Sequence, residues 1–253
     1  YELDGYLPGN HYKETADKIM TYKLTVKTIA KRHGLYASFM PKPKYGMCGS
    51  GMHINMSLFN KEGQNIFVDE NDKNGLSKEA YNFIAGLMKH MRSMTAIINP
   101  IVNSYKRLVP GYEAPTYIAW SATNRSPLIR VPAARGLGTR VELRSPDCAT
   151  NPYLAIAVCL AAGLDGIKNN LQPVDSIQRD IYSMTDEERD EAGIENLPKN
   201  LYEAIQEMRK SDFVKGVLGK EVFKKYIKAK EEEWMEYTSQ VTDWEIDRYL
   251  GRI

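Results

Sequence analysis

Apolar residues recur at helical spacing in three long stretches of the chain. Residues 14–33 predict a helix, and Gly34 stands where a glycine would end it. Residues 77–98 predict a second helix, which ends at Asn99 because the residue before a proline avoids the α region. A third helix is predicted over 151–169, where an asparagine N-cap precedes a proline at the first helical position.

Alternation of polar and apolar residues predicts strands elsewhere. A short strand is expected at 36–39, followed by a Pro/Gly-rich loop over 41–51 that leads to a second strand. In 53–59, His, Asn and Ser fall on one face while Ile, Met and Leu fall on the other. Residues 140–144 alternate charged side chains with Val and Leu. The pattern therefore predicts an antiparallel sheet with one polar face and one face packed on helices.

The last third of the chain reads as a series of short helices. Thr185 and Thr242 are each followed three residues later by glutamate, which is the spacing of a capping box, and Ser211 is a plausible N-cap. We expect 180–253 to form a helical C-terminal subregion. Because no fixed-period repeat and no clear linker divides the sequence, we expect a single domain over 1–253.

Composition excludes several classes of protein. Of the 253 residues, 43% are hydrophobic and 26% are charged, and the net charge is only +2, so neither a nucleic acid nor a membrane surface is an expected partner. The three cysteines have no metal-site spacing, which favours a reducing, cytoplasmic setting. The chain shows no secretory signal, and its start without methionine predicts a processed or truncated product.

Two segments offer groups for a polar ligand. Glycines in 46–51 lead into the strand that carries His53, Asn55 and Ser57, a possible metal ligand and two hydrogen-bonding groups. An exposed sheet with an ordinary hairpin loop is an equally weighted interpretation. In 103–115, cations and a glutamate flank a Pro-Gly turn. From the pattern alone, a surface ion pair is the favoured interpretation of that segment.

A dense local cluster of cations is the strongest chemical signal. Five arginines fall within twenty residues, at positions 125, 130, 135, 140 and 144. Because Arg140, Glu142 and Arg144 share one strand face, the carboxylate could bind a divalent metal while the guanidiniums hold phosphate or a substrate carboxylate. A salt-bridged strand or an oligomer contact is the alternative. We favour a phosphoryl-transfer site with metal and an anionic substrate on the polar face of the sheet.

These segments closely resemble the catalytic domain of type I glutamine synthetases. The motifs that carry the resemblance are Phe39-Met-Pro-Lys-Pro-Lys-Tyr-Gly-Met-Cys-Gly-Ser-Gly-Met-His-Ile-Asn-Met-Ser-Leu, Asn103-Ser-Tyr-Lys-Arg-Leu-Val-Pro-Gly-Tyr-Glu-Ala-Pro, and Arg140-Val-Glu-Leu-Arg-Ser-Pro-Asp with Asn151-Pro-Tyr-Leu-Ala. The match runs from about Ala16 to the carboxyl end. It implies an α+β fold in which helices flank a curved antiparallel sheet, as in the glutamine synthetase/guanido kinase-like catalytic domain.

The resemblance also implies ligands for metal and glutamate. His53 and Glu142 would hold the Mg²⁺ or Mn²⁺ that bridges the phosphates of ATP. Gly49 would contact the substrate through its backbone. Arg107 and Arg144 would bind the carboxylates of glutamate.

Further residues are implied for the nucleotide and for the transferred phosphoryl group. Asn55 and Ser57 would lie at the nucleotide. Arg125 and Arg140 would bind the nucleotide and stabilise the phosphoryl group during transfer, and Arg130 would support the phosphate side. The reaction implied is ATP-dependent phosphorylation of glutamate, followed by attack of ammonia on γ-glutamyl phosphate to give glutamine.

The amino end departs from the family pattern. The family's N-terminal β-grasp domain and first metal-ligand strands are missing, 1–15 is an atypical start, and Glu2 alone echoes a lost ligand. Glu113 would be the flap carboxylate that closes the site and accepts a proton from ammonium. Cys48 replaces a usual Asn, whereas Asn55 is familiar in the Gram-positive-like branch.

Three functions therefore remain open for the sequence. The first is glutamine synthetase, active as a homo-oligomer that is a dodecamer in the family, with this chain impaired by itself. The second is a glutamate–amine ligase of the same superfamily. The third is a non-catalytic fragment that binds nucleotide or a regulatory protein partner.

Overall fold

The computed structural model describes residues 12–112, 114–124 and 126–253. The helices are α1 (Tyr12–Arg32), α2 (Lys78–Ile98), α3 (Ser104–Arg107), α4 (Pro152–Lys168), α5 (Asp186–Glu191), α6 (Leu201–Arg209), α7 (Asp212–Leu218), α8 (Lys220–Thr238) and α9 (Asp243–Tyr249), with 3₁₀ turns at Gly136–Gly138 and Ile181–Ser183. The strands are β1 (Ile54–Met56), β2 (Tyr117–Ile118), β3 (Trp120–Ser121), β4 (Ile129–Arg130), β5 (Val141–Leu143) and β6 (Glu195–Asn196). The predicted α+β class is confirmed.

The helix ends follow the capping chemistry predicted from the sequence. The predicted cap Ser211 accepts a hydrogen bond from the backbone N–H of Val214 at the start of α7, and Asn151 accepts from two N–H groups at the start of α4. Both predicted capping boxes form, at Thr185 and at Thr242. Each cap satisfies backbone donors that the first turn of a helix leaves unpaired. The positions at which these helices begin are therefore determined by residues next to them in the sequence.

The main sheet has the strand order β1-β5-β4-β3. β1 pairs antiparallel with β5, and β5 pairs antiparallel with β4, as predicted. The β3–β4 pair, however, runs parallel, so the sheet is not wholly antiparallel. A separate small ladder joins β2 to β6. Strands of two or three residues are too short for alternation to reveal their direction.

One predicted strand does not form. The segment 36–39 has no regular secondary structure, and Tyr36 is 95% exposed. A strand needs a hydrogen-bonded neighbour, and no described residue pairs with this segment. The prediction at 36–39 is therefore wrong, whereas the strand expected within 53–59 is confirmed in shortened form as β1.

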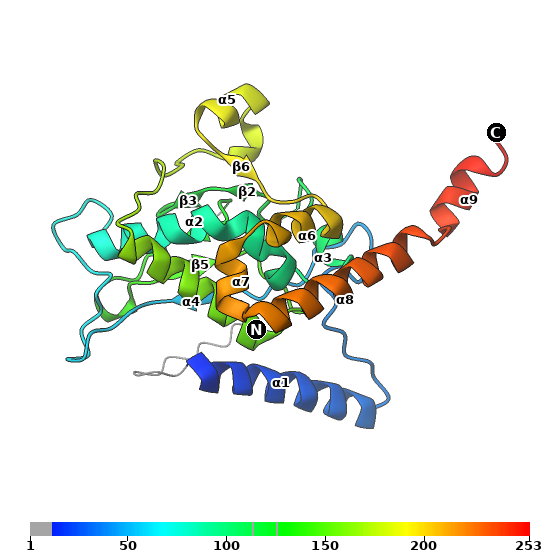
Figure 1. Ribbon diagram of the computed structural model, residues 1–253, viewed down its shortest axis with the longest axis horizontal. Helices are drawn as coiled ribbons and strands as arrows, with labels where there is room; N and C mark the ends of the chain where they lie inside the picture. The colour runs from blue at the N-terminus through cyan, green and yellow to red at the C-terminus, as the bar shows by residue number, and fades with distance from the viewer. Residues whose placement is uncertain (1–11, 113, 125) are drawn as a thin grey trace.

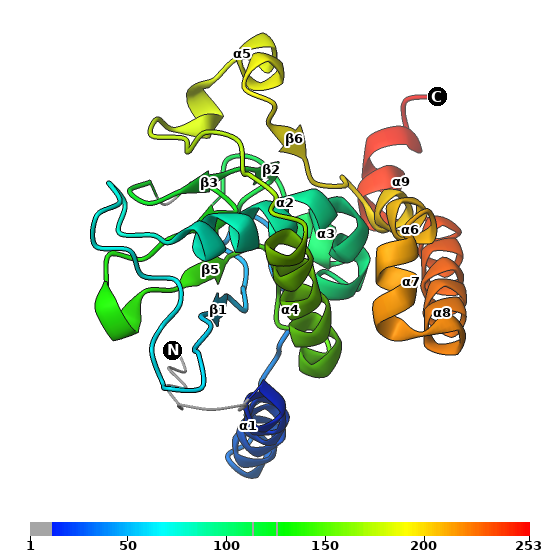
Figure 2. The ribbon, with the colours of Figure 1, turned by 60° about the vertical axis from the view of Figure 1, so that its left-hand side comes forward.

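Helices α2 and α4 lie side by side at the centre of the molecule, with the main sheet to one side and α6, α7 and α8 to the other (Figure 2). The core runs from Phe83 and Met91 on α2 to Val141 and Leu143 on β5, all buried. Helix α1 packs along α4, and α8 leads to α9 away from the body of the molecule (Figure 1). The sheet that carries the predicted site is thus backed by the core.

Glycines allow α2 and α4 to approach closely, which gives a stability prediction. A methyl group on Gly166 would overlap the carbonyl oxygen of Asn82. We therefore expect Gly166→Ala to lower the free energy of unfolding by about 1–3 kcal/mol. Gly216 in α7 has nothing near an added methyl group, so Gly216→Ala should raise stability by about 0.5–1 kcal/mol instead. Urea unfolding of the two variants checks this, and equal effects would contradict the close approach.

Candidate active site

The sheet brings His53, Glu142 and Arg130 together. In the strand register, Glu142 on β5 lies opposite Asn55 on β1 and opposite Arg130 on β4. Residues directly opposite one another share a face of the sheet. His53, one residue before β1, reaches the same carboxylate. The period-two pattern predicted the polar faces of 53–59 and 140–144, and the structure adds Arg130 from β4, a strand that the pattern did not predict.

Glu142 is the centre of this row. Its side chain is only 5% exposed, and each of its oxygens has a partner: Oε1 lies 2.8 Å from His53 Nδ1, and Oε2 accepts a hydrogen bond from Arg130 Nη1 at 3.0 Å. Burial by itself would raise the pKa of Glu142. The hydrogen bond with His53 and the charge of Arg130 outweigh burial, so the pKa lies below its ordinary value. The group is therefore held as a carboxylate.

Arg140 stands at the edge of the row. Its Nε donates to Asn55 Oδ1 at 2.9 Å, and its Nη1 donates to the carbonyl of Gly138 at 3.3 Å. Asn55 thus orients the guanidinium, and its amide oxygen already accepts a hydrogen bond from Arg140. Ser57 follows β1 and is half-buried. Three of the predicted nucleotide-side residues, Asn55, Arg130 and Arg140, are therefore linked around β1 and β5.

Arg107 lies beneath the glycine loop. Only 4% of it is exposed, and its guanidinium donates to the carbonyls of Ser145, at 2.6 Å, and Arg144, at 3.1 Å. A Cβ on Gly51 would lie 2.5 Å from Arg107 Nη2, and a Cβ on Gly49 would lie 2.9 Å from Arg107 Cγ. At Gly51 the arginine fills the space that a Cβ would take, and at Gly49 the Pro41 carbonyl oxygen, 2.5 Å from an added Cβ, is closer still.

Arg107 and Arg144 were predicted to bind carboxylates of one substrate. The structure brings them together, since the Arg107 guanidinium donates to the Arg144 carbonyl. Burial lowers the pKa of Arg107, and the charge of nearby Asp147 opposes that effect. In this structure the described hydrogen bonds of Arg107 go to backbone. Its contact with glutamate therefore stays a prediction.

Two residues of this region were missed by the sequence reasoning. Asp147 is fully buried, and its carboxylate accepts from Asn99 Nδ2 at 2.9 Å and from the N–H of Ala149 at 2.9 Å. Burial raises its pKa. Lys42 is also nearly buried, and it contacts the ring of Tyr112. Both residues stand inside the quoted motifs, but a motif does not show which polar groups are buried.

Three predicted site residues, Glu2, Glu113 and Arg125, lie outside the described residues. Within the described ranges, no group of three or more His, Cys, Asp or Glu side chains could surround a metal ion. His53 and Glu142 therefore supply two donors. Nor does any helix in the described part of the chain have the length and apolar character needed to cross a membrane.

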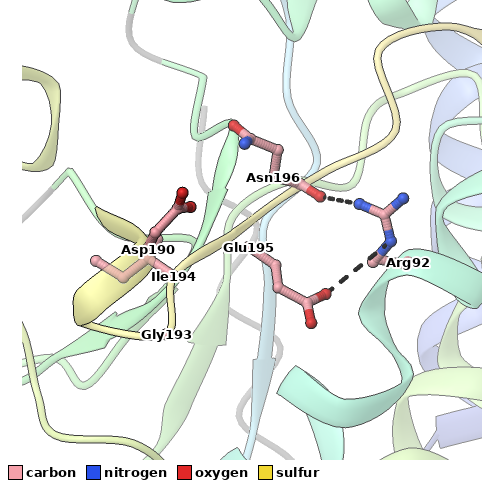
Figure 3. A pocket seen from close by; sticks show the side chains of 6 residues that line it. All are labelled: Arg92, Asp190, Gly193, Ile194, Glu195 and Asn196. Atoms are coloured by element: carbon pink, nitrogen blue, oxygen red, sulfur yellow. Dashed lines mark hydrogen bonds and ion pairs between the residues drawn. The ribbon is translucent and has the colours of Figure 1, made fainter. Parts of the chain in front are cut away.

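A shallow hollow lies elsewhere, between α2 and the segment that joins α5 to β6 (Figure 3). Arg92 borders it and interacts with the Asn196 carbonyl and the Glu195 carboxylate across the opening (Figure 3). None of the predicted site residues lines this hollow. The candidate site is therefore the open polar face of the sheet, not this depression.

Comparisons with known proteins agree on one family. The family profile described as the catalytic domain of glutamine synthetase matches residues 6–249. A glutamine synthetase of Clostridium saccharobutylicum is 63% identical over 94% of this chain and 54% of its own length. One of Methanosarcina mazei is 57% identical over 94% of this chain and 53% of its own length. The chain thus spans about half the length of these curated relatives.

Solved structures agree with the sequence relatives. The structure named apo GmaS without ligand superimposes with a TM-score of 0.84 at 39% identity, over 95% of this chain and 54% of that protein. The structure named GmaS/ADP complex gives a TM-score of 0.83, also at 39% identity, over 93% of this chain and 54% of that one. The fold of the GmaS structures therefore covers nearly the whole of this chain.

Proposed function

Because the chain belongs to the glutamine synthetase family, we propose that the protein it comes from joins ammonia to glutamate in an ATP-dependent reaction through γ-glutamyl phosphate. The observation that carries this proposal is the family match over 6–249, together with 63% identity to a relative named glutamine synthetase. The chain spans about half of that relative. The activity is therefore proposed for the whole protein.

ATP and a divalent cation, Mg²⁺ or Mn²⁺, are the proposed cofactors. His53 and Glu142 would hold the cation, and they fit it, because an imidazole nitrogen and a carboxylate oxygen lie 2.8 Å apart and both are ligands of divalent metals. When bound, the cation supplies positive charge to the phosphates of ATP. Other ligands would be phosphate oxygens, water or groups outside the described residues, among which Glu2 stays a prediction.

Arginines on the polar face suit the phosphate groups. Arg130 lies opposite Glu142 on the neighbouring strand, Arg140 precedes Glu142 by two residues along the chain, and hydrogen bonds hold both guanidiniums in place. Fixed donors stabilise developing negative charge without reorganising during the reaction. A GmaS relative was solved with ADP, which supports nucleotide binding by this fold. We assign Asn55 and Ser57 to the nucleotide, and Arg125 stays a prediction.

The glycine loop and the residues around Arg107 would form the glutamate side. Gly49 is exposed above Arg107, and Arg144 follows β5, close enough to Glu142 for its charge to help lower the pKa of that carboxyl. Two guanidiniums are suited to the two carboxylates of glutamate, because each can pair with a carboxylate in two-pronged fashion. Glu113 would close the site and accept a proton from ammonium, as the resemblance to the family implies.

We place the whole protein in the cytoplasm as a homo-oligomer, as the resemblance implies. All three cysteines are free thiols, which agrees with a reducing compartment.

Product analysis with the full-length protein tests the proposal. Ammonium should support phosphate release with one glutamine formed for each phosphate, and primary amines should be much poorer acceptors. A higher kcat/KM with an amine than with ammonium would replace the proposal by the glutamate–amine ligase alternative. Binding of ATP by the full-length protein without phosphate release would leave the non-catalytic, nucleotide-binding alternative.

The isolated chain provides a separate prediction. We expect it to bind ATP weakly in the presence of Mg²⁺, while forming little or no glutamine, because its described residues supply only two donors for the metal. Calorimetric titration of ATP with and without Mg²⁺ measures the first effect, and a glutamine assay measures the second. Sustained turnover by the homogeneous chain would contradict this expectation.

A further inference from the structure

Lys42 is a lysine that the fold buries almost completely. Only 8% of it is exposed, whereas the neighbouring Lys44 is exposed. Its backbone is held from both sides by one amide: the Lys42 N–H donates to Asn103 Oδ1 at 2.8 Å, and Asn103 Nδ2 donates to the Lys42 carbonyl at 3.0 Å. Since Asn103 caps α3, Lys42 is fixed to the helix that carries Arg107.

The ammonium group of Lys42 has two contacts of a different kind. Its Nζ lies 3.6 Å from the ring centroid of Tyr112, and it donates a hydrogen bond to the Met47 carbonyl. No acidic side chain among the described residues forms an ion pair with it. An aromatic face attracts a cation most strongly when water is excluded from the contact. Among the described residues, the Tyr112 ring and the Met47 carbonyl are therefore the groups that stabilise the buried ammonium group of Lys42.

These two contacts join two segments of the proposed glutamate site, the glycine loop and the turn after α3. Met47 belongs to the glycine loop, two residues before Gly49, and Gly49 packs on Arg107. Tyr112 ends the turn that follows α3, and Gly111 before it has φ +87°, a conformation that favours glycine. Lys42 thus links the loop that packs on Arg107 to the turn that follows Arg107 in the chain. A lysine that served only to fill space would not need its ammonium group in this place.

We propose that Lys42 is a positioning residue: its ammonium group fastens the glycine loop at Met47 to the ring of Tyr112, and so holds Gly49 and Arg107 in the geometry that binds glutamate. The part of the proposal that concerns glutamate rests on the proposed function. The fastening itself depends only on the contacts of Lys42. Loss of the ammonium group should loosen both segments while leaving the polar row at Glu142 in place.

Hydrogen–deuterium exchange on this chain tests the fastening without any need for activity. Lys42→Met should increase exchange about 10-fold at the backbone amides of 46–51 and 109–112, whereas Lys44→Met should leave both segments unchanged. Tyr112→Leu should reproduce the effect, and Tyr112→Phe, which keeps the ring, should not. Equal exchange in Lys42→Met and Lys44→Met, or in Tyr112→Leu and Tyr112→Phe, would overturn the fastening.

Steady-state kinetics on the full-length protein test the positioning role. Lys42→Met and Tyr112→Leu should each raise the KM for glutamate about 10-fold and the KM for ATP less than about 2-fold, and the double variant should be no worse than either single variant. Equal rises in both KM values, or additive effects, would leave a structural role only and overturn positioning. If the wild-type protein makes no glutamine, the proposed function fails, and exchange alone decides the fastening. If Lys42→Met does not fold, the Tyr112 pair carries both tests.

Discussion

Replacing Glu142 with glutamine in the full-length protein should lower the affinity for Mn²⁺ and the rate of glutamine formation by at least about 100-fold. Changes to groups that merely orient a metal ligand already cost 10- to 100-fold, and Glu142 is itself a proposed ligand. Its carboxylate is 5% exposed and bonded to His53 and Arg130, so solvent cannot easily take its place. Removal of the negative charge should therefore lower both the Mn²⁺ affinity and the rate, because no other group among the described residues replaces it.

Glutamine is the informative replacement because it keeps the size of the side chain and can still accept from Arg130. Glu142→Ala would also remove the carboxylate that accepts the hydrogen bond of Arg130, which adds a loss of stability to the loss of binding. Calorimetry with Mn²⁺ and thermal unfolding on the same samples separate the two effects. The metal-ligand role is rejected if Glu142→Gln binds Mn²⁺ within about threefold of wild type. Exposed Glu62→Gln is the matched control and should change neither value.

The parts of the fold that could be predicted are those determined by neighbouring residues. The caps at Asn151 and Ser211 and the capping boxes at Thr185 and Thr242 depend on a side chain that bonds to backbone two or three residues away. Their positions follow from spacing alone. The row of His53 and Glu142 was also predictable, because alternation places polar residues on one face of each strand.

The parts that could not be predicted depend on contacts between distant residues. The parallel β3–β4 pair involves strands of two residues, which show no periodicity. The segment 36–39 has strand-like composition but no described partner, so local preference was insufficient. Buried Lys42 and Asp147 are fixed by Asn103 and Asn99, 61 and 48 residues away along the chain. Spacing along the sequence does not reveal such pairs.

The resemblance to a family located the site more sharply than the residue pattern did, but it left the geometry open. It assigned Arg107 to a substrate carboxylate, and the structure places that guanidinium on two backbone carbonyls beneath glycines. A buried arginine bonded to backbone can support a loop and still offer a donor to a ligand. The glutamate affinity of an Arg107 variant of the full-length protein, compared with wild type, measures how far this arginine acts on the substrate.

Arg140→Ala in the full-length protein should lower kcat about 100-fold or more, with a change in ATP affinity of less than about 5-fold. Arg140 is oriented by the hydrogen bond from its Nε to Asn55 Oδ1, and among the described residues only Nη1 of its terminal nitrogens has a partner, the Gly138 carbonyl. A donor fixed in this way acts mainly on charge that develops during phosphoryl transfer. Its loss should therefore affect the transition state more than the bound nucleotide.

The variant Asn55→Ala measures how much of that effect comes from orientation. Without the amide oxygen, the guanidinium keeps its charge and loses its alignment, so kcat should fall by a smaller factor than in Arg140→Ala. Arg179→Ala is the matched control, because that arginine is 57% exposed and pairs with Glu188 away from the sheet, and it should leave kcat unchanged. Single-turnover measurements with saturating ATP separate chemistry from binding. Equal losses of ATP affinity and kcat in Arg140→Ala would show that the arginine anchors the nucleotide in the ground state instead.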